Sequence, residues 1–494
     1  MKNLKALLLL CSILLITTSC FKDEDDDQIA SSEINDFVWK GMNSWYNWQE
    51  NVPNLADTKD DNQGTYYSFL SQTGNPETFF NALRYQYGTT DRFSWFITDY
   101  IEQLQGFQGI SKSIGLKLQA VQINAGGDII LYVRYVADNS PAANANVKRG
   151  DIINAINGKV LKTSNFQTIA GDLDQESVKL SFVTENAGVL TPKEDKTLTA
   201  AVLFENPVYL KKVFNDIAGR KVGYLVYNGF RSSYNDELND AFAYFKSENI
   251  NELILDLRLN GGGSVGTSAY LASMIYADAG TGIFANLTFN SKHREEDGAY
   301  KFENTLNIFN ENDVKTGQEP INRLNSINRL YVLTSSSTAS ASEMIINGLK
   351  AYMPVRVVGT TTYGKNVGSI TLFDSPKTDY TDRTSANPSH LFAMQPIVFQ
   401  IFNKNGESDY TQGFTPNILV KEYDYWNVIL PFGDENEVVL KAALDDIKGL
   451  TPKASGTKKT SNYKRLELPT SKNKFEHEMY LDGSFFEKRN SLSN

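Results

Sequence analysis

Apolar residues recur with different periods along the chain and divide it into three folded regions. In the first region, residues 32–109, large apolar side chains recur at helical spacing, so we predict a small helical domain whose aromatic residues form its core. Residues 110–204 show short runs of alternating apolar and polar positions, which predict a compact β domain. The helical set is Phe37, Met42, Trp45, Tyr46, Trp48, Phe79, Phe80, Leu83 and Tyr85, and the expected strands are 115–120, 128–133 and 178–183.

The third region, residues 205–450, alternates buried strands with amphipathic helices. Such alternation predicts an α/β layer architecture, so the fold class of the whole chain is multidomain α/β. The expected strands are 223–227, 253–257, 330–333 and 355–360, and helices are indicated by Leu238, Ala241, Phe242 and Phe245 and by residues 344–349. Residues 451–494 are polar and lysine-rich with little periodicity, so we expect a weakly ordered tail or an added surface segment.

The N-terminus has the composition of an export signal. Lys2 and Lys5 precede an apolar run, 6–16, that is too short to span a membrane as a helix, so we predict a signal peptide over residues 1–19. The small residues before Cys20 resemble the lipobox of bacterial lipoproteins, and a lipidated acidic tether, 20–31, would follow. We therefore expect an outer-membrane lipoprotein, anchored through Cys20 and facing the periplasm or the cell surface. The alternative is an ordinary secretory signal.

Composition removes several classes of function. The 494 residues carry 48 basic and 58 acidic side chains, a net charge of −10, without a Lys/Arg-rich run, so nucleic acid is not an expected partner. Both cysteines, Cys11 and Cys20, lie in the N-terminal segment, which excludes a catalytic thiol or thiolate metal site from the folded body. The three histidines are widely separated. We expect no metal site and no cofactor.

The β domain contains a specific motif. Residues 140–143 read SPAA and residues 147–158 read VKRGDIINAING, and together they resemble the SPA…GDxIxxxNG segment of PDZ domains. Asn157-Gly158 suits a hairpin turn at positive φ. The resemblance implies a peptide partner that is added as a strand, with its terminal carboxylate held by the loop of Ser113, Ile114, Gly115 and Leu116. The alternative is a domain that only packs against its neighbours or gates them.

A serine-rich loop follows the strand at 330–333 and opens a helix. Ser340 would lie at that helix N-terminus, where backbone N–H groups and the helix dipole can stabilise an oxyanion. Ser340 with Glu343 three residues later is also an ordinary capping box, which needs no catalysis. The motif alone favours the cap.

Two further motifs change this interpretation. The sequence LDLRLNGGG, residues 255–263, leaves a buried strand in a glycine turn, and Lys365 lies 25 residues after Ser340 across one helix–strand unit. With GFTPN at 413–417, these motifs resemble the C-terminal processing (tail-specific) serine peptidases, a tricorn-related family with a PDZ domain before the catalytic core. The resemblance covers most of the chain. It implies a ClpP/crotonase-like core that cleaves unstructured or C-terminal segments of polypeptides.

The resemblance also implies residue roles. Ser340 would be the nucleophile and Lys365 its general base, the amides of Gly262 and Ala341 would hold the oxyanion, and Glu343 would be an auxiliary residue. A lysine base must be neutral, so burial must lower its pKa. The chain departs from the family at Ser369, where a glutamine that holds the lysine is usual.

Three alternatives remain open. Ser369 favours a catalytically weak or inactive, lipid-anchored peptide-binding protein. The sequence GSVG around Ser264 completes a G-x-S-x-G pattern typical of α/β-hydrolases, for which Asp374 and His390 would have to complete a triad. Carbohydrate capture would draw on the aromatic-rich segments and has no motif.

Overall fold

A six-stranded sheet forms the base of the α/β region, residues 205–450, which is the expected catalytic region. The computed structural model describes residues 31–280, 282–451, 463–469 and 477–481, so the expected signal peptide, Cys20 and nearly all of the acidic tether lie outside the described residues. The strand order is β10-β11-β12-β18-β19-β24, and every pair except β10–β11 is parallel. The strands are β10 (Val208–Ile217), β11 (Arg220–Tyr227), β12 (Glu252–Asp256), β18 (Leu330–Thr334), β19 (Val355–Gly359) and β24 (Ile418–Leu419).

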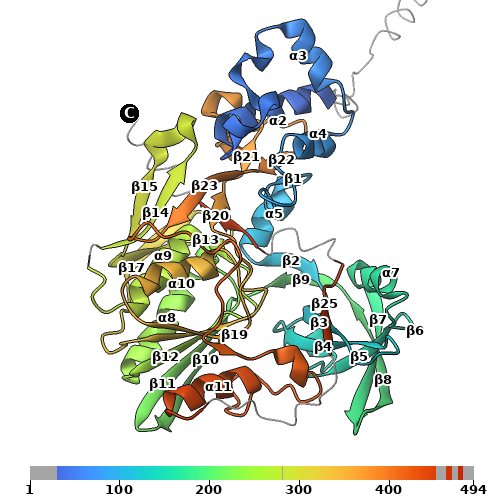
Figure 1. The fold of residues 1–494 in the computed structure, drawn as a ribbon, viewed down its shortest axis with the longest axis vertical. Coiled ribbons are helices and arrows are strands. Elements are labelled where there is room, and N and C mark those ends of the chain that lie inside the picture. Colours follow the sequence, from blue (N-terminus) through green and yellow to red (C-terminus); the bar gives the residue numbers. More distant parts are fainter. Residues whose placement is uncertain (1–30, 281, 452–462, 470–476, 482–494) are drawn as a thin grey trace, which may run out of the picture.

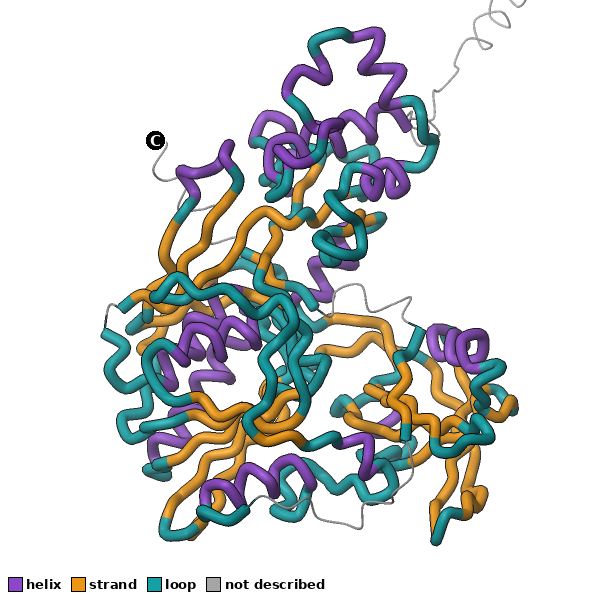
Figure 2. The backbone as a smooth tube through the Cα atoms, in the orientation of Figure 1, coloured by secondary structure: helices purple, strands orange, loops and turns teal. Residues whose placement is uncertain are grey.

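Three helices separate this sheet from a second six-stranded sheet. Figures 1 and 2 show α8 (Asn235–Ser247), α9 (Val265–Ile275) and α10 (Ala341–Lys350) between the two sheets, while α11 (Val438–Ile447) covers the outer face of the first. The second sheet has the order β13-β26-β20-β23-β14-β15. Its strands are β13 (Gly263–Ser264), β26 (Met479–Tyr480), β20 (Val367–Ser369), β23 (Ile397–Phe402), β14 (Ile283–Phe289) and β15 (Gly298–Lys301). The predicted α/β layering is thus confirmed.

The N-terminal helical region shares its core with the catalytic region. It contains α2 (Ser31–Trp45), α3 (Gln63–Leu70), α4 (Pro76–Ala82) and α5 (Tyr100–Phe107), and one continuous hydrophobic cluster runs from α2 to α10. β1 (Trp95–Ile97) pairs with β22 (Ala393–Gln395), which pairs with β21 (Leu372–Phe373). The predicted aromatic residues are largely buried core, but they pack partly against residues far away in the sequence.

Residues 110–204 form a separate β domain with its own core, to the right in Figure 1. β2 (Ile110–Ser113) pairs with β9 (Ala201–Phe204), which closes the domain at both predicted boundaries. The main sheet runs through β3 (Leu116–Gln122), β4 (Ile129–Val136), β5 (Ile152–Ile156), β7 (Ser177–Asn186) and β8 (Val189–Thr199), and two short helices, α6 (Pro141–Asn144) and α7 (Phe166–Ala170), accompany it. The predicted hairpin turn is confirmed, since Asn157 and Gly158 have φ of 50° and 75° before β6 (Lys159–Val160).

The described parts of the C-terminal region are not a surface tail. β25 (Lys464–Leu466) pairs with β3 of the β domain, and β26 lies inside the second catalytic sheet with Met479, Tyr480 and Leu481 buried. The expectation of a polar, weakly ordered segment is therefore wrong for these residues, because runs of two or three residues that pair with distant strands have no periodicity to read.

The described residues contain neither a candidate membrane-spanning helix nor a candidate metal cluster. None of their helices is long and apolar enough to cross a membrane. Nor do these residues include a cluster of three His, Cys, Asp or Glu side chains arranged to hold a metal ion.

Candidate active site

Three loops meet at the carboxyl ends of neighbouring parallel strands. They follow β12, β18 and β19 and carry the glycine turn, Ser340 and Lys365, so the sheet places the three sequence motifs beside one another. The first two loops are bonded directly: Thr338 Oγ1 donates to Leu257 O (2.7 Å), and Ser342 Oγ donates to Asn260 O (3.0 Å).

Ser340 occupies a strained position before α10. Its backbone has φ of 63° and ψ of −119°, a conformation that costs a serine on the order of 1–3 kcal/mol. The side chain is fully buried, and its Oγ has no hydrogen-bond partner among the described residues. An ordinary helix cap uses its hydroxyl to satisfy the helix N–H groups. This serine instead has a free hydroxyl on a strained turn, as nucleophilic serines do.

Glu343 connects the loop of Ser340 to the loop of Lys365. One carboxylate oxygen, Oε2, accepts from the backbone N–H groups of Ser340 (2.9 Å) and Lys365 (2.8 Å). The other, Oε1, accepts from Thr362 Oγ1 (2.5 Å) and Gly364 N (2.7 Å). Burial raises the pKa of Glu343 to about 7, against the opposing effect of these four donors. The carboxylate therefore holds both candidate catalytic residues by their main chains.

The Lys365 amine is fully buried and faces the C-terminal segment. Its Nζ donates to His477 O (2.8 Å) and lies 3.5 Å from Glu478 Oε2 and 5.1 Å from the centre of the Phe93 ring. Burial lowers the pKa of Lys365 from its usual value, and the Glu478 carboxylate partly opposes that shift. The direction is the one that a lysine base requires. Lys365 makes no hydrogen bond to Ser340 Oγ in this structure.

The two amides of the glycine turn have different hydrogen-bond partners. Gly262 has φ of 118°, and a Cβ added there would lie 2.6 Å from the Ser340 Cβ, so only glycine fits beside the serine. The Gly262 N–H is turned back to Asn260 Oδ1 (2.9 Å), whereas the Gly263 N–H donates to Glu478 O (2.6 Å). The family resemblance implied Gly262 as the oxyanion amide; in this structure the N–H of Gly262 is bonded within its own turn, and the N–H of Gly263 is the one that reaches another segment. Ala341 begins α10, where an N–H has no partner within the helix.

A glutamine from another strand lies beside Ser369. Gln395 Nε2 donates to Ser369 Oγ (3.0 Å), and Gln103 Nε2 donates in turn to Gln395 Oε1 (2.7 Å). Ser369 Oγ also lies 3.2 Å from Glu478 Oε2. A buried polar chain thus reaches this position from β22, which sequence spacing from Lys365 could not reveal.

Ser264, the rival nucleophile, is a helix cap. Its Oγ accepts from Thr267 N (3.1 Å) at the start of α9, and its backbone is unstrained, with φ of −62°. His390 Nε2 lies 3.2 Å from Asp374 Oδ2, and both residues belong to the connection between β21 and β22. The hydroxyl of Ser264 thus already has a structural role.

The predicted carboxylate loop of the β domain packs on α6. Gly115 has φ of 80°, its N–H lies 3.1 Å from Ser113 Oγ, and Ala142 N donates to Ile114 O (3.1 Å). Leu116 begins β3. The loop therefore lies at the start of the strand whose edge pairs with β25.

Sequence reasoning missed a buried charge network between the β domain and the catalytic region. Arg258 Nη1 donates to Glu437 (2.8 Å) and Glu422 (3.2 Å), and Arg258 also pairs with Asp256 (2.6 Å). Arg149 of the β domain pairs with Glu422 too. Although burial acts to raise it, Arg149, Arg258 and Arg134 hold the pKa of Glu422 well below its usual range. Arg258 and Asp256 were visible in the LDLRLNGGG motif, but Glu422 and Glu437 lie more than 160 residues later.

Comparisons with known proteins agree with this geometry. Residues 221–420 match the description "Peptidase family S41", and residues 33–95 match "Peptidase S41 N-terminal domain". The chain belongs to peptidase family S41. The two regions together make up more than half of its 494 residues.

Named relatives in this family are distant in sequence. A probable CtpA-like serine protease from Staphylococcus aureus strain RF122 is 25% identical over 229 residues, 46% of this chain and 40% of the relative. Its counterpart from Staphylococcus saprophyticus is 25% identical over 62% of this chain and 55% of the relative, so the match spans about half the length of these proteins. A putative S41 protease from Bacteroides fragilis superposes with a TM-score of 0.64 at 26% identity, covering 84% of this chain and 97% of the other.

Proposed function

We propose that this protein is a serine endopeptidase that uses Ser340 and Lys365 to cleave unstructured or C-terminal segments of polypeptides. The observation that carries the proposal is the strained, fully buried Ser340, whose hydroxyl meets no partner in the described ranges and whose backbone is joined through Glu343 to the loop of a buried lysine. Peptide substrates, an extended-peptide site on the β domain and a lipid anchor at Cys20 belong to the same proposal.

The residues divide the reaction as follows. The neutral amine of Lys365 takes the proton of the Ser340 hydroxyl as Oγ attacks the scissile carbonyl, and the amides of Gly263 and Ala341 stabilise the oxyanion. The lysine then gives the proton to the leaving amine, and water hydrolyses the acyl-enzyme. Glu343 positions both residues through their main chains and stays outside proton transfer.

A specific observation favours the inactive alternative. In this structure Lys365 Nζ is bonded to His477 O and faces Glu478 instead of Ser340. A peptide-binding protein without turnover would show the same arrangement, so activity itself must be measured.

The decisive test compares three alanine variants on an unfolded protein substrate. Ser340→Ala and Lys365→Ala should each lower kcat at least about a thousandfold, because neither the nucleophile nor the base has a substitute. Ser264→Ala is the matched control and should keep appreciable turnover, with a stability loss of about 1 kcal/mol from the lost cap. Chelators should leave the activity unchanged.

Thermal melts would establish that each variant folds. A dead Ser264→Ala beside an active Ser340→Ala would contradict the proposal in favour of the hydrolase pattern. The peptide-binding alternative would be favoured if the substrate is cleaved neither by the parent nor by the variants Glu478→Gln and Met479→Asp, which are designed to displace the C-terminal segment from the active site.

A further inference from the structure

A segment of the chain's own C-terminal region lies beside the candidate catalytic residues as an extended strand. β26 pairs in parallel with β13 on one side, in the register Gly263 to Met479 and Ser264 to Tyr480, and with β20 on the other, at Ser369 to Tyr480. Both neighbouring strands border the active site: β13 continues the glycine turn, and β20 follows Lys365. The segment His477–Leu481 therefore lies where a peptide added as a strand would meet the catalytic residues.

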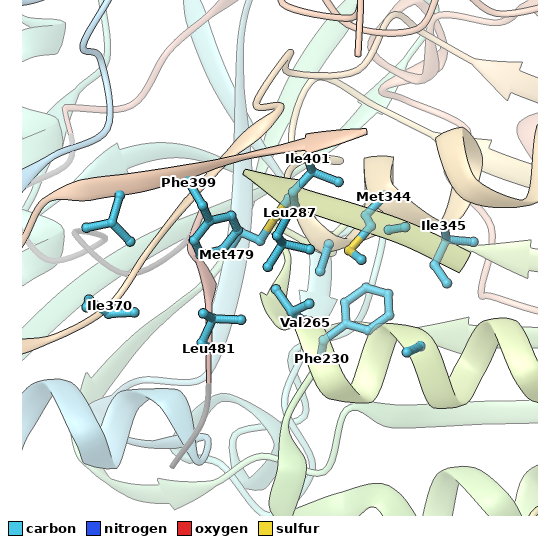
Figure 3. Packing of buried hydrophobic residues seen from close by; sticks show 14 of the residues in the cluster. Phe230, Val265, Leu287, Met344, Ile345, Ile370, Phe399, Ile401, Met479 and Leu481 are labelled. Atoms are coloured by element: carbon cyan, nitrogen blue, oxygen red, sulfur yellow. The ribbon is translucent and has the colours of Figure 1, made fainter. Parts of the chain in front are cut away.

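Apolar side chains anchor this segment on one face. Met479 and Leu481 belong to the main hydrophobic cluster, and Figure 3 shows Met479 among Phe399, Leu287 and Ile401. Met479 is fully buried. Burial of such a side chain is worth about 1.5–3 kcal/mol, which offsets part of the entropy lost when the segment is ordered.

A fitted polar pocket receives the Glu478 side chain. Trp95 Nε1 donates to Oε1 (3.1 Å), while Oε2 lies 3.2 Å from Ser369 Oγ and 3.5 Å from Lys365 Nζ. The three groups come from β1, β20 and the catalytic loop, and Glu478 is buried. A buried carboxylate needs hydrogen-bond donors or a cation to replace the water that it has lost. The surroundings of Glu478 supply two neutral donors and one cation.

The segment also occupies the groups that turnover requires. Its Glu478 carbonyl accepts the Gly263 N–H that we assign to the oxyanion (2.6 Å), and its His477 carbonyl accepts from Lys365 Nζ (2.8 Å). Ser340 Oγ, by contrast, has no hydrogen-bond partner within the described part of the chain. The candidate base is thus hydrogen-bonded to the chain's own C-terminal segment and not to the candidate nucleophile.

A second stretch of the same region occupies the β domain. Lys464, Arg465 and Leu466 pair antiparallel with Gln122, Val121 and Ala120 of β3, and Leu466 and Leu468 pack against the core of that domain. This direction carries the chain toward the loop at Ser113–Leu116, as a bound peptide terminus would run. The chain's own C-terminal region therefore pairs with the edge of β3 in the β domain and with β13 beside the candidate catalytic residues.

We propose that residues 463–469 and 477–481 are a tethered inhibitor, and that the pocket of Trp95, Ser369 and Lys365 selects extended peptides by a glutamate side chain, which Glu478 supplies in cis. The inference rests on the proposed peptidase function for its activity readout, but its binding readout is independent. A competing peptide with glutamate at this position would have to displace the segment before Ser340 and Lys365 can meet.

Two variants of the full chain test the inhibition. Glu478→Gln weakens the polar anchor, and Met479→Asp expels the segment by placing a charge in the apolar cluster. If the segment is bound in more than nine-tenths of the molecules, each variant should cleave an unfolded protein at least about ten times faster than the parent. Glu77→Gln changes an exposed carboxylate outside the C-terminal region and should match the parent.

Thermal melts and intact mass accompany these assays. The use of two variants keeps the test open if one of them does not fold. Folded variants that are no faster than the parent would overturn inhibition in cis. Cleavage of the parent's own chain after Glu478 would also overturn it, because the segment would then be a substrate.

Binding of a free peptide separates this inference from the proposed function. A fluorescent, N-acetylated and amidated His-Glu-Met-Tyr-Leu peptide should bind the Ser340→Ala/Met479→Asp chain at least about tenfold more tightly than the same peptide with glutamine in place of glutamate. Equal affinities would overturn the glutamate pocket, whatever the activity. Glutamate-dependent binding together with no cleavage by any variant would support the pocket and contradict the peptidase.

Discussion

Glu343 does more at this site than its place in a capping motif suggests. A helix cap needs one carboxylate oxygen to meet the N-cap N–H, whereas this carboxylate meets four donors from two loops. Its neighbours Thr362 and Phe414 extend the arrangement, since Phe414 N donates to Thr362 Oγ1 (2.7 Å). The GFTPN motif therefore braces the lysine loop through Thr362.

We predict that Glu343→Gln lowers kcat by about a hundredfold and changes KM little. The glutamine amide would direct N–H groups at backbone N–H donors, so the loops of Ser340 and Lys365 would separate, and small displacements at a reacting centre have effects of this size. Glu407→Gln is the matched control, because Glu407 is an exposed carboxylate paired with Lys350. An unchanged kcat in a folded Glu343→Gln variant would contradict the positioning role.

The same residue should shape the pH dependence. Burial raises the pKa of Glu343 to about 7. The carboxylate that accepts hydrogen bonds from the four donors therefore forms as the pH rises through 7. Burial also lowers the pKa of Lys365, so the neutral base forms at higher pH in the same direction. Activity of the parent should therefore rise with pH from below 7, and Glu343→Gln should remove the step near pH 7. For stability the sign is opposite: because the folded pKa is raised, the contribution of Glu343 is lost as pH rises from its unfolded value toward 7.

At the scale of elements, the buried charge network joins the β domain to the catalytic sheet. Arg258 at the end of β12 contacts Glu422 and Glu437, and Arg134 of β4 donates to Arg258 O (3.1 Å). The cost of burying these charges is offset only while every partner is present. The orientation of the β domain thus depends on a few charged side chains next to the glycine turn.

We predict that Arg258→Met destabilises the protein by about 3–5 kcal/mol, because it leaves buried carboxylates without their cation. Arg329→Met is the matched control: Arg329 pairs with Glu252 at a partly exposed position and should cost about 1 kcal/mol or less. Denaturant unfolding followed by circular dichroism measures both. Equal losses in the two variants would show that the network contributes no more than a surface pair.

Strand β25 gives a test of the proposed peptide site on the β domain. Leu466→Asp places a charge against the hydrophobic core of the β domain, so it should release β25 and leave the edge of β3 open to added peptides. A peptide with an apolar C-terminal residue should then bind the variant more tightly than the parent, and amidation of its terminus should weaken that binding, because the loop recognises a carboxylate. Fluorescence anisotropy measures both affinities. Equal binding of free-acid and amidated peptides would contradict the PDZ-like role.

At the scale of the whole molecule, the sequence predicted the features that depend on neighbouring residues or on a recognisable motif. The strands at β3, β4, β7, β11, β12 and β18 follow from periodicity, and the grouping of Ser340, Lys365 and the glycine turn was implied by the family resemblance. Gln395, Trp95 and Glu478 could not be found this way, because they reach the site from β22, β1 and the C-terminal region. The sequence also did not predict that the helical region shares its core with the α/β region. Hydrophobic spacing identifies which face of a helix is buried, but it does not show which other residues pack against that face.

At the scale of the whole molecule, we predict that lipidation of Cys20 anchors the protein to a membrane, and fractionation would test this. The small residues before this cysteine and the charged tether after it favour cleavage before Cys20 and attachment of acyl chains, which together make membrane binding stable. Cys20→Ser should therefore move the protein from the membrane pellet to the soluble fraction. Cys11→Ser is the matched control, because Cys11 lies within the apolar run and would be removed with the signal. Retention of the Cys20→Ser protein in the pellet as complete as that of the parent would contradict anchoring at this residue.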